Sequence, residues 1–516
     1  YYAPGTAHSP LQAPQQWLDR FKGEFDMGWD AMRSQICERQ RGANLVPEAT
    51  PCTPRTSAIP AWSSLSADEQ AFSRKLMEAY AAMLAFSDHQ FGRVVDELKR
   101  SGRYDNTLII FIQGDNGAAA ESLLGELSEV AMFNQLNTHR HDLQLVPMIG
   151  TEKSKPVNAS GWAWAMNAPF QWSKQVASHF GGTRNGLVVS WPKKVAEPGI
   201  IKRDFQHVID IAPTIYDAAG VTMPEHVDGV TQLPLDGVSM LGGITGATHS
   251  NGATEPRTQY FEILGNRALY DNGWVAATTP RRLPWSIHYL QPHYEWELYH
   301  VDEDFSQANN LAKTHPDKLK ALQNKFIEVT QGQHVQPIDD RFIERFNPGF
   351  RPNIMDGRKQ FTYFPSTHSL SVMSVPMLES NWMLTAEITV RADDASGPVI
   401  ARGDMFSGWG IQIDKGYVHL IYRPSHLEKD IQTIVSDAPL AAGKHSIRAQ
   451  MTPLSGGQHQ LTMAIDDTQV ATRLVVDKIA FSRVETHVGR YGDIPLVSQQ
   501  PYNGKVSTEI VEVTLH

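Results

Sequence analysis

Two oxygen-bearing side chains follow directly on a short apolar run. Residues 108–112 read Leu-Ile-Ile-Phe-Ile, and Gln113 leads from this run to Gly114, Asp115, Asn116 and Gly117. Such a run is typical of a fully buried strand of a parallel sheet, and open α/β sheets bind ligands at the carboxyl ends of their strands. A carboxylate and an amide oxygen suit a hard cation such as Ca²⁺ or Mg²⁺. A plain Asp-Asn-Gly turn is the alternative, because these residues are also common turn formers.

Three further segments accompany this one. The first is Ala-Pro-Gly-Thr-Ala-His-Ser-Pro, which holds His8. The second is Lys174 followed by Ser-His-Phe-Gly-Gly-Thr-Arg at 178–184, and the third is His-Val-Ile-Asp-Ile-Ala-Pro-Thr-Ile at 207–215. Together with the Asp-Asn pair, this ordered series resembles the sulfatase family of the alkaline phosphatase superfamily, and most closely the large bacterial arylsulfatases. The resemblance extends over roughly residues 1–345.

The resemblance implies a role for four residues. Lys174 would contact the sulfate ester as a compact positive charge, and His8 would contact it as the acid for the leaving group. Asp115 and Asn116 would supply part of the ligand set of Ca²⁺, or alternatively of Mg²⁺. Taken singly, Lys174 would be interpreted as a solvated lysine at a helix end and His8 as a loop histidine.

Two features that the family carries are expected upstream of residue 1. They are a pair of metal-binding aspartates and a Cys- or Ser-x-Pro-x-Arg motif, whose first residue becomes the formylglycine nucleophile. The sequence begins at Tyr1 with neither, and with no signal peptide. Cys52 opens a Cys-Thr-Pro-Arg run, but the Arg comes one residue too early and the run follows His8, so we interpret Cys52 as a loop cysteine. We therefore expect these residues alone to hydrolyse aryl sulfates negligibly.

Composition limits the classes of partner. The chain has 516 residues, which indicates two or more domains. A net charge of −10 without a long basic run argues against nucleic-acid and anionic-membrane partners. No apolar run approaches the ~18–20 residues of a membrane span. The two cysteines, Cys37 and Cys52, allow one disulfide without implying it, and only the resemblance favours a periplasmic or secreted protein over a cytoplasmic one.

The elements that must position these residues alternate between helix and strand. In order, the patterns predict a helix at 66–101 opened by a Ser-x-x-Glu capping box, a strand at 107–112, a strand at 187–191 and a helix at 209–219 closed by Gly220. This alternation predicts a doubly wound α/β sheet. By the resemblance, it would be an alkaline-phosphatase-like sheet whose N-terminal part is missing. Residues 258–300 predict a small antiparallel sheet, and 313–334 a further helix.

Other notable residues have plainer interpretations. The long segment 118–170 carries Trp162 and Trp164, and we interpret it as a wall on the substrate side, with core-capping tryptophans as the alternative. The His-Arg-His run at 139–141 is interpreted as a solvated loop. His207 and Asp210 are interpreted as structural, the latter as a cap. Gly181 and Gly182 are expected to allow a close approach of the backbone beside the site.

The pattern changes near residue 358. Short alternating runs recur there between Gly, Asp and Asn turns, which predicts an all-β sandwich or jelly roll. It resembles the concanavalin-like sandwiches appended to some large arylsulfatases. We therefore expect a sulfatase domain at 1–357 and a β-sandwich at 358–516.

The function implied by the resemblance is hydrolysis of a small-molecule sulfate ester, possibly an aryl sulfate. One alternative is a phosphomonoester or phosphonate monoester hydrolase of the same superfamily. The other is a truncated, non-catalytic sulfatase-like protein that binds a ligand through the same residues.

Overall fold

A computed structural model describes most of the chain. The described residues are 1–114, 116–128, 142–246, 257–286, 290–341, 355, 357–366, 368–371, 374–376, 378, 381–476, 485–492, 495–497 and 502–516. Asp115 and the run at 139–141 lie outside them. The chain forms two compact units, the first made of Tyr1–Gly125 and Asn158–Phe342, and the second of Glu126–Val157 and Ile343–His516.

Helices of the first unit include the long one that the capping box predicts. The α-helices are α1 Gln15–Leu18, α2 Gly28–Gly42, α3 Ala67–Arg100, α6 Ser160–Met166, α7 Phe180–Thr183, α8 Ile211–Ala219, α9 Leu241–Thr245 and α10 Pro316–Gly332. At the start of α3, the Ser66 hydroxyl accepts from the Glu69 amide at 3.3 Å, and the Glu69 carboxylate accepts from the Ser66 amide at 2.8 Å. The predicted capping box is confirmed.

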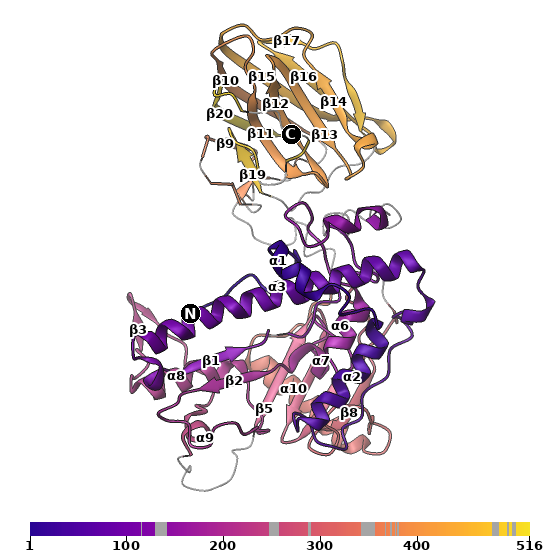
Figure 1. Ribbon diagram of the computed structural model, residues 1–516, viewed down its shortest axis with the longest axis vertical. Helices are drawn as coiled ribbons and strands as arrows, with labels where there is room; N and C mark the ends of the chain where they lie inside the picture. The colour runs from indigo at the N-terminus through magenta and orange to yellow at the C-terminus, as the bar shows by residue number, and fades with distance from the viewer. Residues whose placement is uncertain are drawn as a thin grey trace. The chain divides into compact units, whose positions relative to one another are not determined.

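The two strands beside α3 differ from the prediction. Strand β1 (Ile109–Ile112) pairs with β2 (Leu187–Ser190) in an antiparallel, two-stranded sheet (Figure 1). Phe111 packs on Phe91 of α3, with ring centroids 5.3 Å apart. Its partner Val188 is nevertheless 60% exposed. The expectation of a fully buried parallel strand is therefore wrong, because an apolar run fixes neither the direction of a strand nor what covers its second face.

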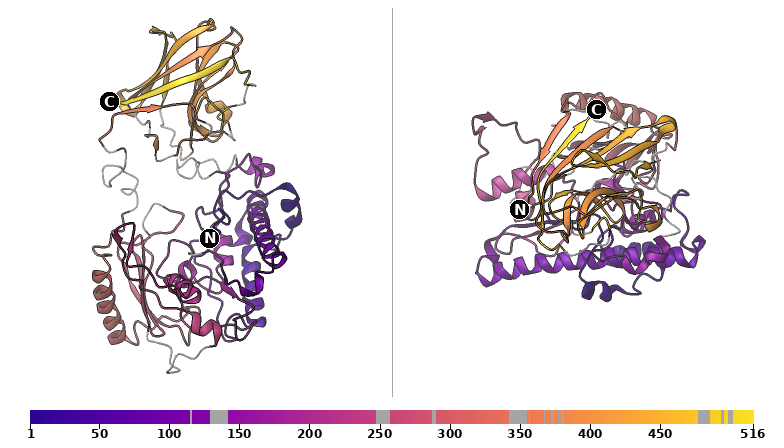
Figure 2. Two further views of the ribbon diagram at one scale, coloured as in Figure 1. Left: turned by 90° about the vertical axis from the view of Figure 1, so that its left-hand side faces the viewer. Right: turned by 90° about the horizontal axis from the view of Figure 1, so that it is seen from above.

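A four-stranded antiparallel sheet lies between two apolar layers. Its strands are β5 Thr258–Ile263, β6 Asn266–Asp271, β7 Trp274–Thr278 and β8 Trp296–His300, in that order. Leu322 and Phe326 of α10 pack on one face, and Figure 2 shows α10 running along the sheet. Phe180, at the start of α7, packs with side chains of the sheet including Tyr270 and Tyr299. The predicted small sheet and the predicted helix after it are both confirmed.

Two antiparallel sheets make up most of the second unit. One has the order β17-β16-β15-β10-β20-β9, with β18 also pairing with β16, and the other has the order β14-β13-β12-β11-β19. Their strands are β9 Gln360–Tyr363, β10 Trp382–Val390, β11 Gly397–Asp404, β12 Ser407–Asp414, β13 Tyr417–Arg423, β14 Gln432–Val435, β15 Gly443–Pro453, β16 His459–Ile465, β17 Thr468–Gln469, β18 Leu474–Val476, β19 Thr486–Val488 and β20 Val506–Leu515. One core cluster contains side chains of both sheets, so the sheets pack face to face. The C-terminal region is strand-rich, as predicted.

A segment that interrupts the first unit in the sequence is part of the second unit. Lys155 pairs with Asp404 at 2.9 Å, and His426 lies 3.1 Å from Asp142. Asp404 and Asp142 are each 1% exposed as side chains. A carboxylate removed from water in this way needs such a partner. The described residues 126–128 and 142–157 therefore belong structurally with the C-terminal sheets, which their position in the sequence gave no reason to expect.

Tryptophans of the first unit form a core, not a wall. Trp29, Trp62 and Trp162 pack together with ring centroids 4.8 to 5.7 Å apart. Trp162 is 0% exposed and its indole N–H donates to the Ser73 carbonyl at 2.8 Å. The interpretation of 118–170 as a substrate-side wall is wrong for Trp162 and Trp164, whose short helix α6 carries no periodic pattern long enough to detect.

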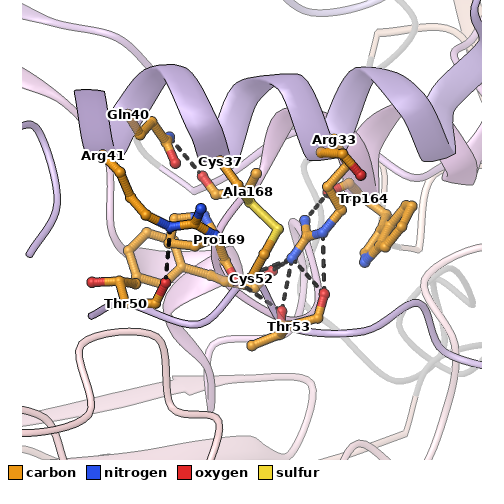
Figure 3. Close-up of a disulfide and its surroundings, with 12 residues drawn as sticks. Arg33, Cys37, Gln40, Arg41, Thr50, Cys52, Thr53, Trp164, Ala168 and Pro169 are labelled. Atoms are coloured by element: carbon orange, nitrogen blue, oxygen red, sulfur yellow. Dashed lines mark hydrogen bonds between the residues drawn. A yellow bond between two sulfur atoms is a disulfide. The ribbon is translucent and has the colours of Figure 1, made fainter. Parts of the chain in front are cut away.

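A disulfide and a buried arginine fasten α2 to this core (Figure 3). Cys37 on α2 is bonded to Cys52. Arg33, one turn earlier and 2% exposed, donates only to uncharged oxygens: the carbonyls of Thr53, Trp164, Pro169 and Phe170 and the Thr53 hydroxyl. Burial lowers the pKa of Arg33 to about 9. Its guanidinium thereby ties α2 to both ends of the chain segment 164–170.

We predict that the disulfide stabilises the first unit. Replacing both cysteines, as Cys37→Ala with Cys52→Ala, frees a loop of sequence separation 15 and should lower the free energy of unfolding by about 3 kcal/mol. Urea unfolding followed by tryptophan fluorescence measures this, because the tryptophan cluster lies in the same unit. Dithiothreitol should destabilise the wild type similarly and leave the double variant unchanged. Equal unfolding midpoints for the oxidised wild type and the variant would contradict the prediction.

Candidate active site

The loop after β1 is bound to the segment that carries Lys174. The Gly117 amide donates to Asn185 Oδ1 at 3.1 Å, and the Ala118 amide donates to Asn167 Oδ1 at 3.0 Å. The Lys174 amide donates to the Ala118 carbonyl at 3.1 Å. Asn116, exposed at the tip of this loop, therefore lies close in the chain to the backbone contact with Lys174.

Glycines make this contact possible. A Cβ on Gly117 would lie 2.0 Å from the Gly181 carbonyl oxygen and 3.3 Å from the Lys174 nitrogen. A Cβ on Gly181 would meet the Gln171 oxygen at 2.2 Å, and one on Gly182 the Val176 oxygen at 2.3 Å. The predicted close approach at Gly181 and Gly182 is confirmed, and Gly117 is an additional contact point that sequence reasoning did not identify.

His8 and Lys174 meet around one carboxylate. Glu121 Oε1 lies 3.7 Å from His8 Nε2 and 3.9 Å from Lys174 Nζ. The Ser9 hydroxyl donates to Glu121 Oε2 at 3.2 Å. The side chain of His8 is 58% exposed, whereas those of Lys174 and Glu121 are 20% and 15% exposed. We call these three residues the His8–Glu121–Lys174 cluster. The cluster combines two groups able to bind an anion with a carboxylate that lowers the positive potential around them.

Glu121 was missed because its type and position carry no pattern. It lies in the non-periodic stretch after the Asp-Asn pair, where an acidic residue is ordinarily solvated. Only the fold, which brings residues 8, 121 and 174 together, reveals it.

A second set of polar side chains is buried at the N-terminal end of α7. His179 is 0% exposed; one ring nitrogen, Nε2, lies 2.9 Å from Glu297 Oε2, and the other lies 2.9 Å from the Ser178 hydroxyl. Since a carboxylate only accepts, Nε2 donates to Glu297. Tyr299 also donates to Glu297, at 3.1 Å, and burial raises the pKa of that phenol. Although the order Ser-His-Glu is that of a nucleophilic triad, Ser178 is 1% exposed, and the network anchors α7 instead of meeting substrate.

His207 and Asp210 are structural, as predicted. The Asp210 carboxylate, 0% exposed, accepts from the His207 amide at 2.8 Å and from the Val238 amide at 2.9 Å. Arg257 donates to both of its oxygens, at 3.0 and 3.2 Å. Burial lowers the pKa of His207, which keeps that ring neutral near pH 7.

The described residues include only one of the two predicted metal ligands. Asp115 lies outside the described residues, and Asn116 is the one predicted ligand among them. In the part of the chain that the structure describes, no group of three or more His, Cys, Asp or Glu residues is arranged to hold a metal ion. The same residues include no helix long and apolar enough to cross a membrane.

Cys52 has its sulfur in a disulfide with Cys37. A disulfide sulfur is not a thiolate nucleophile, and neither cysteine is free. The interpretation of Cys52 as a loop cysteine and not a nucleophile agrees with this bond.

We predict that Gly117 controls the geometry of the loop that carries Asn116. Gly117→Ala places a Cβ against the Gly181 oxygen, so it should destabilise the fold by about 2 kcal/mol or more beyond Gly114→Ala. Gly114 is the matched control, because both residues have φ of +75° and the nearest atom to a Cβ on Gly114 is 4.0 Å away. Urea unfolding of the two variants measures the difference. Equal destabilisation would show that the φ angle alone, and not the contact, matters.

Comparisons with known proteins agree with this assembly of motifs. The family profile described as Sulfatase matches residues 1–221, and that described as N-sulphoglucosamine sulphohydrolase, C-terminal, matches residues 177–332. An uncharacterized sulfatase of Schizosaccharomyces pombe is 30% identical over 354 residues, which are 68% of this chain and 61% of that protein. An arylsulfatase of Klebsiella aerogenes is 30% identical over 233 residues, 45% of this chain and 48% of that protein.

Among solved structures, Ps i-CgsB in complex with k-i-k-neocarrahexaose is 19% identical, with a TM-score of 0.37, over 67% of this chain and 52% of that one. The chain spans about half to three fifths of the length of the two curated relatives above. Both family profiles, which together run from residue 1 to residue 332, describe sulfatases, and so do both relatives. The chain belongs to the sulfatase family.

Proposed function

We propose that this protein hydrolyses sulfate monoesters, and aryl sulfates among them. The observation that carries the proposal is the His8–Glu121–Lys174 cluster, since two residues from separate sulfatase-like motifs lie within 4 Å of the same carboxylate. The loop carrying Asn116 is hydrogen-bonded to the backbone of Lys174, which brings a third motif to the same place.

The chain's own residues have distinct tasks in this proposal. Lys174 binds a sulfuryl oxygen, and because its side chain is only 20% exposed, water screens this interaction only partly. His8, at 58% exposure, is accessible to an incoming ester and donates a proton to the leaving oxygen. Preorganised charges of this kind are usually the largest contribution to the rate of such a reaction.

A divalent cation is proposed at the carboxyl end of β1. Asp115 and Asn116 would hold it, and their oxygen-only donor set fits Ca²⁺, with Mg²⁺ as the alternative. Such an ion supplies charge stabilisation and orients the ester. The nucleophile is proposed to be a formylglycine carried by a residue outside these 516, because both cysteines here are in a disulfide.

Two further proposals concern the setting of the domain. The Cys37–Cys52 disulfide supports a periplasmic or secreted location, since such bonds persist in oxidising compartments. The two face-to-face sheets of the second unit support the proposal that this unit is a concanavalin-like jelly roll.

We predict that both cationic residues matter for the rate. Lys174→Ala and His8→Ala, made in the full-length protein encoded by the gene, should each lower kcat/KM for 4-nitrophenyl sulfate by roughly 10²-fold or more, as the loss of a transition-state contact does. Lys193→Ala, at an exposed lysine outside the cluster, is the matched control and should retain full activity. A wild type faster on 4-nitrophenyl phosphate would favour the phosphomonoesterase alternative, and one inactive on both esters would favour a ligand-binding protein.

We also predict that Asn116 contributes to cation affinity. Asn116→Ala should weaken Ca²⁺ binding about tenfold or more in isothermal titration calorimetry on the full-length protein, because one oxygen ligand is lost. Asn324→Ala, at an exposed asparagine on α10, is the control. Unchanged Ca²⁺ affinity in Asn116→Ala would remove this residue from the ligand set.

A further inference from the structure

We infer that Glu121 makes the site selective for a singly charged sulfate ester over a doubly charged phosphate ester. The inference rests on the proposed function, and it assigns a specificity-determining role to a residue outside the motifs that carry the family resemblance. Glu121 is the described carboxylate that lies within 4 Å of both His8 Nε2 and Lys174 Nζ.

The geometry makes Glu121 act through its charge. Its separations of 3.7 Å from His8 and 3.9 Å from Lys174 exceed the usual 2.7–3.2 Å of a hydrogen bond. The carboxylate therefore lowers the positive potential at both groups without a direct hydrogen bond to either. The Ser9 hydroxyl, at 3.2 Å, is the neighbour that holds it by a hydrogen bond.

Shielding from water strengthens this charge. Glu121 and Lys174 are 15% and 20% exposed, so the effective dielectric constant between them is well below that of bulk water. An anion that reaches Lys174 must come close to the Glu121 carboxylate, since the two groups are only 3.9 Å apart. Every additional negative charge on the anion adds to that repulsion.

Sulfate and phosphate monoesters differ in the charge that they carry near neutral pH. A sulfate monoester carries one negative charge, whereas a phosphate monoester loses a second proton with a pKa of about 6 and approaches two charges above it. The charges of Lys174 and Glu121 cancel. A singly charged ester is therefore attracted by Lys174 while its one charge meets limited repulsion from Glu121. The second charge of a phosphate ester gains no second lysine or arginine from this cluster, whereas it adds to the repulsion from Glu121.

The test compares two esters on the full-length protein. We measure kcat/KM for 4-nitrophenyl sulfate and 4-nitrophenyl phosphate at pH 8 in the wild type and in Glu121→Gln, which keeps the shape of the side chain and an oxygen for Ser9. The ratio of phosphate to sulfate activity should rise roughly 10- to 100-fold in Glu121→Gln, mainly through KM for the phosphate ester. Glu121→Asp, which retains the charge, should change the ratio much less.

The pH profile separates a charge effect from a structural one. In the wild type, discrimination against the phosphate ester should grow as the pH rises through about 6, where its second charge appears. In Glu121→Gln this rise should be largely lost. Glu303→Gln, which removes an 81% exposed carboxylate 3.4 Å from His300, controls for net charge and should leave the ratio unchanged.

Opposite results have a clear meaning. Equal loss of activity on both esters in Glu121→Gln would show that Glu121 only positions His8 and Lys174, and an unchanged ratio would show no role in selectivity; either overturns the inference. If the wild type hydrolyses neither ester, the proposed function fails, and the selectivity is decided by calorimetric binding of the same two esters. A phosphate-to-sulfate affinity ratio that Glu121→Gln leaves unchanged would then overturn the inference as well.

Discussion

The close backbone approach of Gly117 to Gly181 and Lys174 is the constraint on which the site depends. There is space for a hydrogen and not for a methyl group at this point, since a Cβ would come within 2.0 Å of the Gly181 oxygen. The contact joins the loop after β1 to the segment before α7, which are far apart in the sequence. Asn116 on one side and Lys174 on the other are therefore placed by backbone packing, which is less adaptable than side-chain packing.

The segment carrying Lys174 is fastened at one end by a buried arginine and at the other by a half-buried one. At the first end, Arg33 binds carbonyls of Trp164, Pro169 and Phe170. At the second, Arg184 lies 3.9 Å from the centre of the Phe305 ring, and burial lowers its pKa to about 10. Neutral carbonyls contact the charge of Arg33, and aromatic ring faces contact that of Arg184, whose charge Asp302 also favours.

Lys174 has the opposite arrangement, because its neighbour is a carboxylate and its ammonium is partly exposed. The contrast separates charges that build the fold from charges that can meet a ligand. Glu297 belongs with the first kind, since its hydrogen bond with the buried His179 anchors α7 to the four-stranded sheet. Only groups near the surface, His8 above all, are accessible to an ester.

Much of the fold could be predicted from local patterns. The capping box at Ser66, the stop at Gly220 and the alternating strands at 258–300 each depend on neighbouring residues, and each is confirmed. The antiparallel pairing of β1 with β2, the tryptophan core and the docking of 126–157 depend on partners distant in sequence. No single-sequence pattern encodes those partners.

The site divides in the same way. His8 and Lys174 were identified because each lies in a motif, while the roles given to them, and to Asp115 and Asn116, stay predictions. Glu121 lies in no motif, and only the folded chain places its carboxylate between His8 and Lys174. Contacts of this kind cannot be predicted without the fold, because the interacting side chains come from three segments that are far apart in the sequence.

The most direct measurement is a crystal structure of the full-length protein with perrhenate, a singly charged tetrahedral anion whose rhenium is located by anomalous scattering. We expect an anomalous peak beside the Asn116 loop, with oxygens of the anion within hydrogen-bond distance of Lys174 Nζ and His8 Nε2. The Glu121 carboxylate should be turned away from the anion. A perrhenate ion bound elsewhere, with the His8–Glu121–Lys174 cluster unchanged and without the ion, would contradict this assignment of the site.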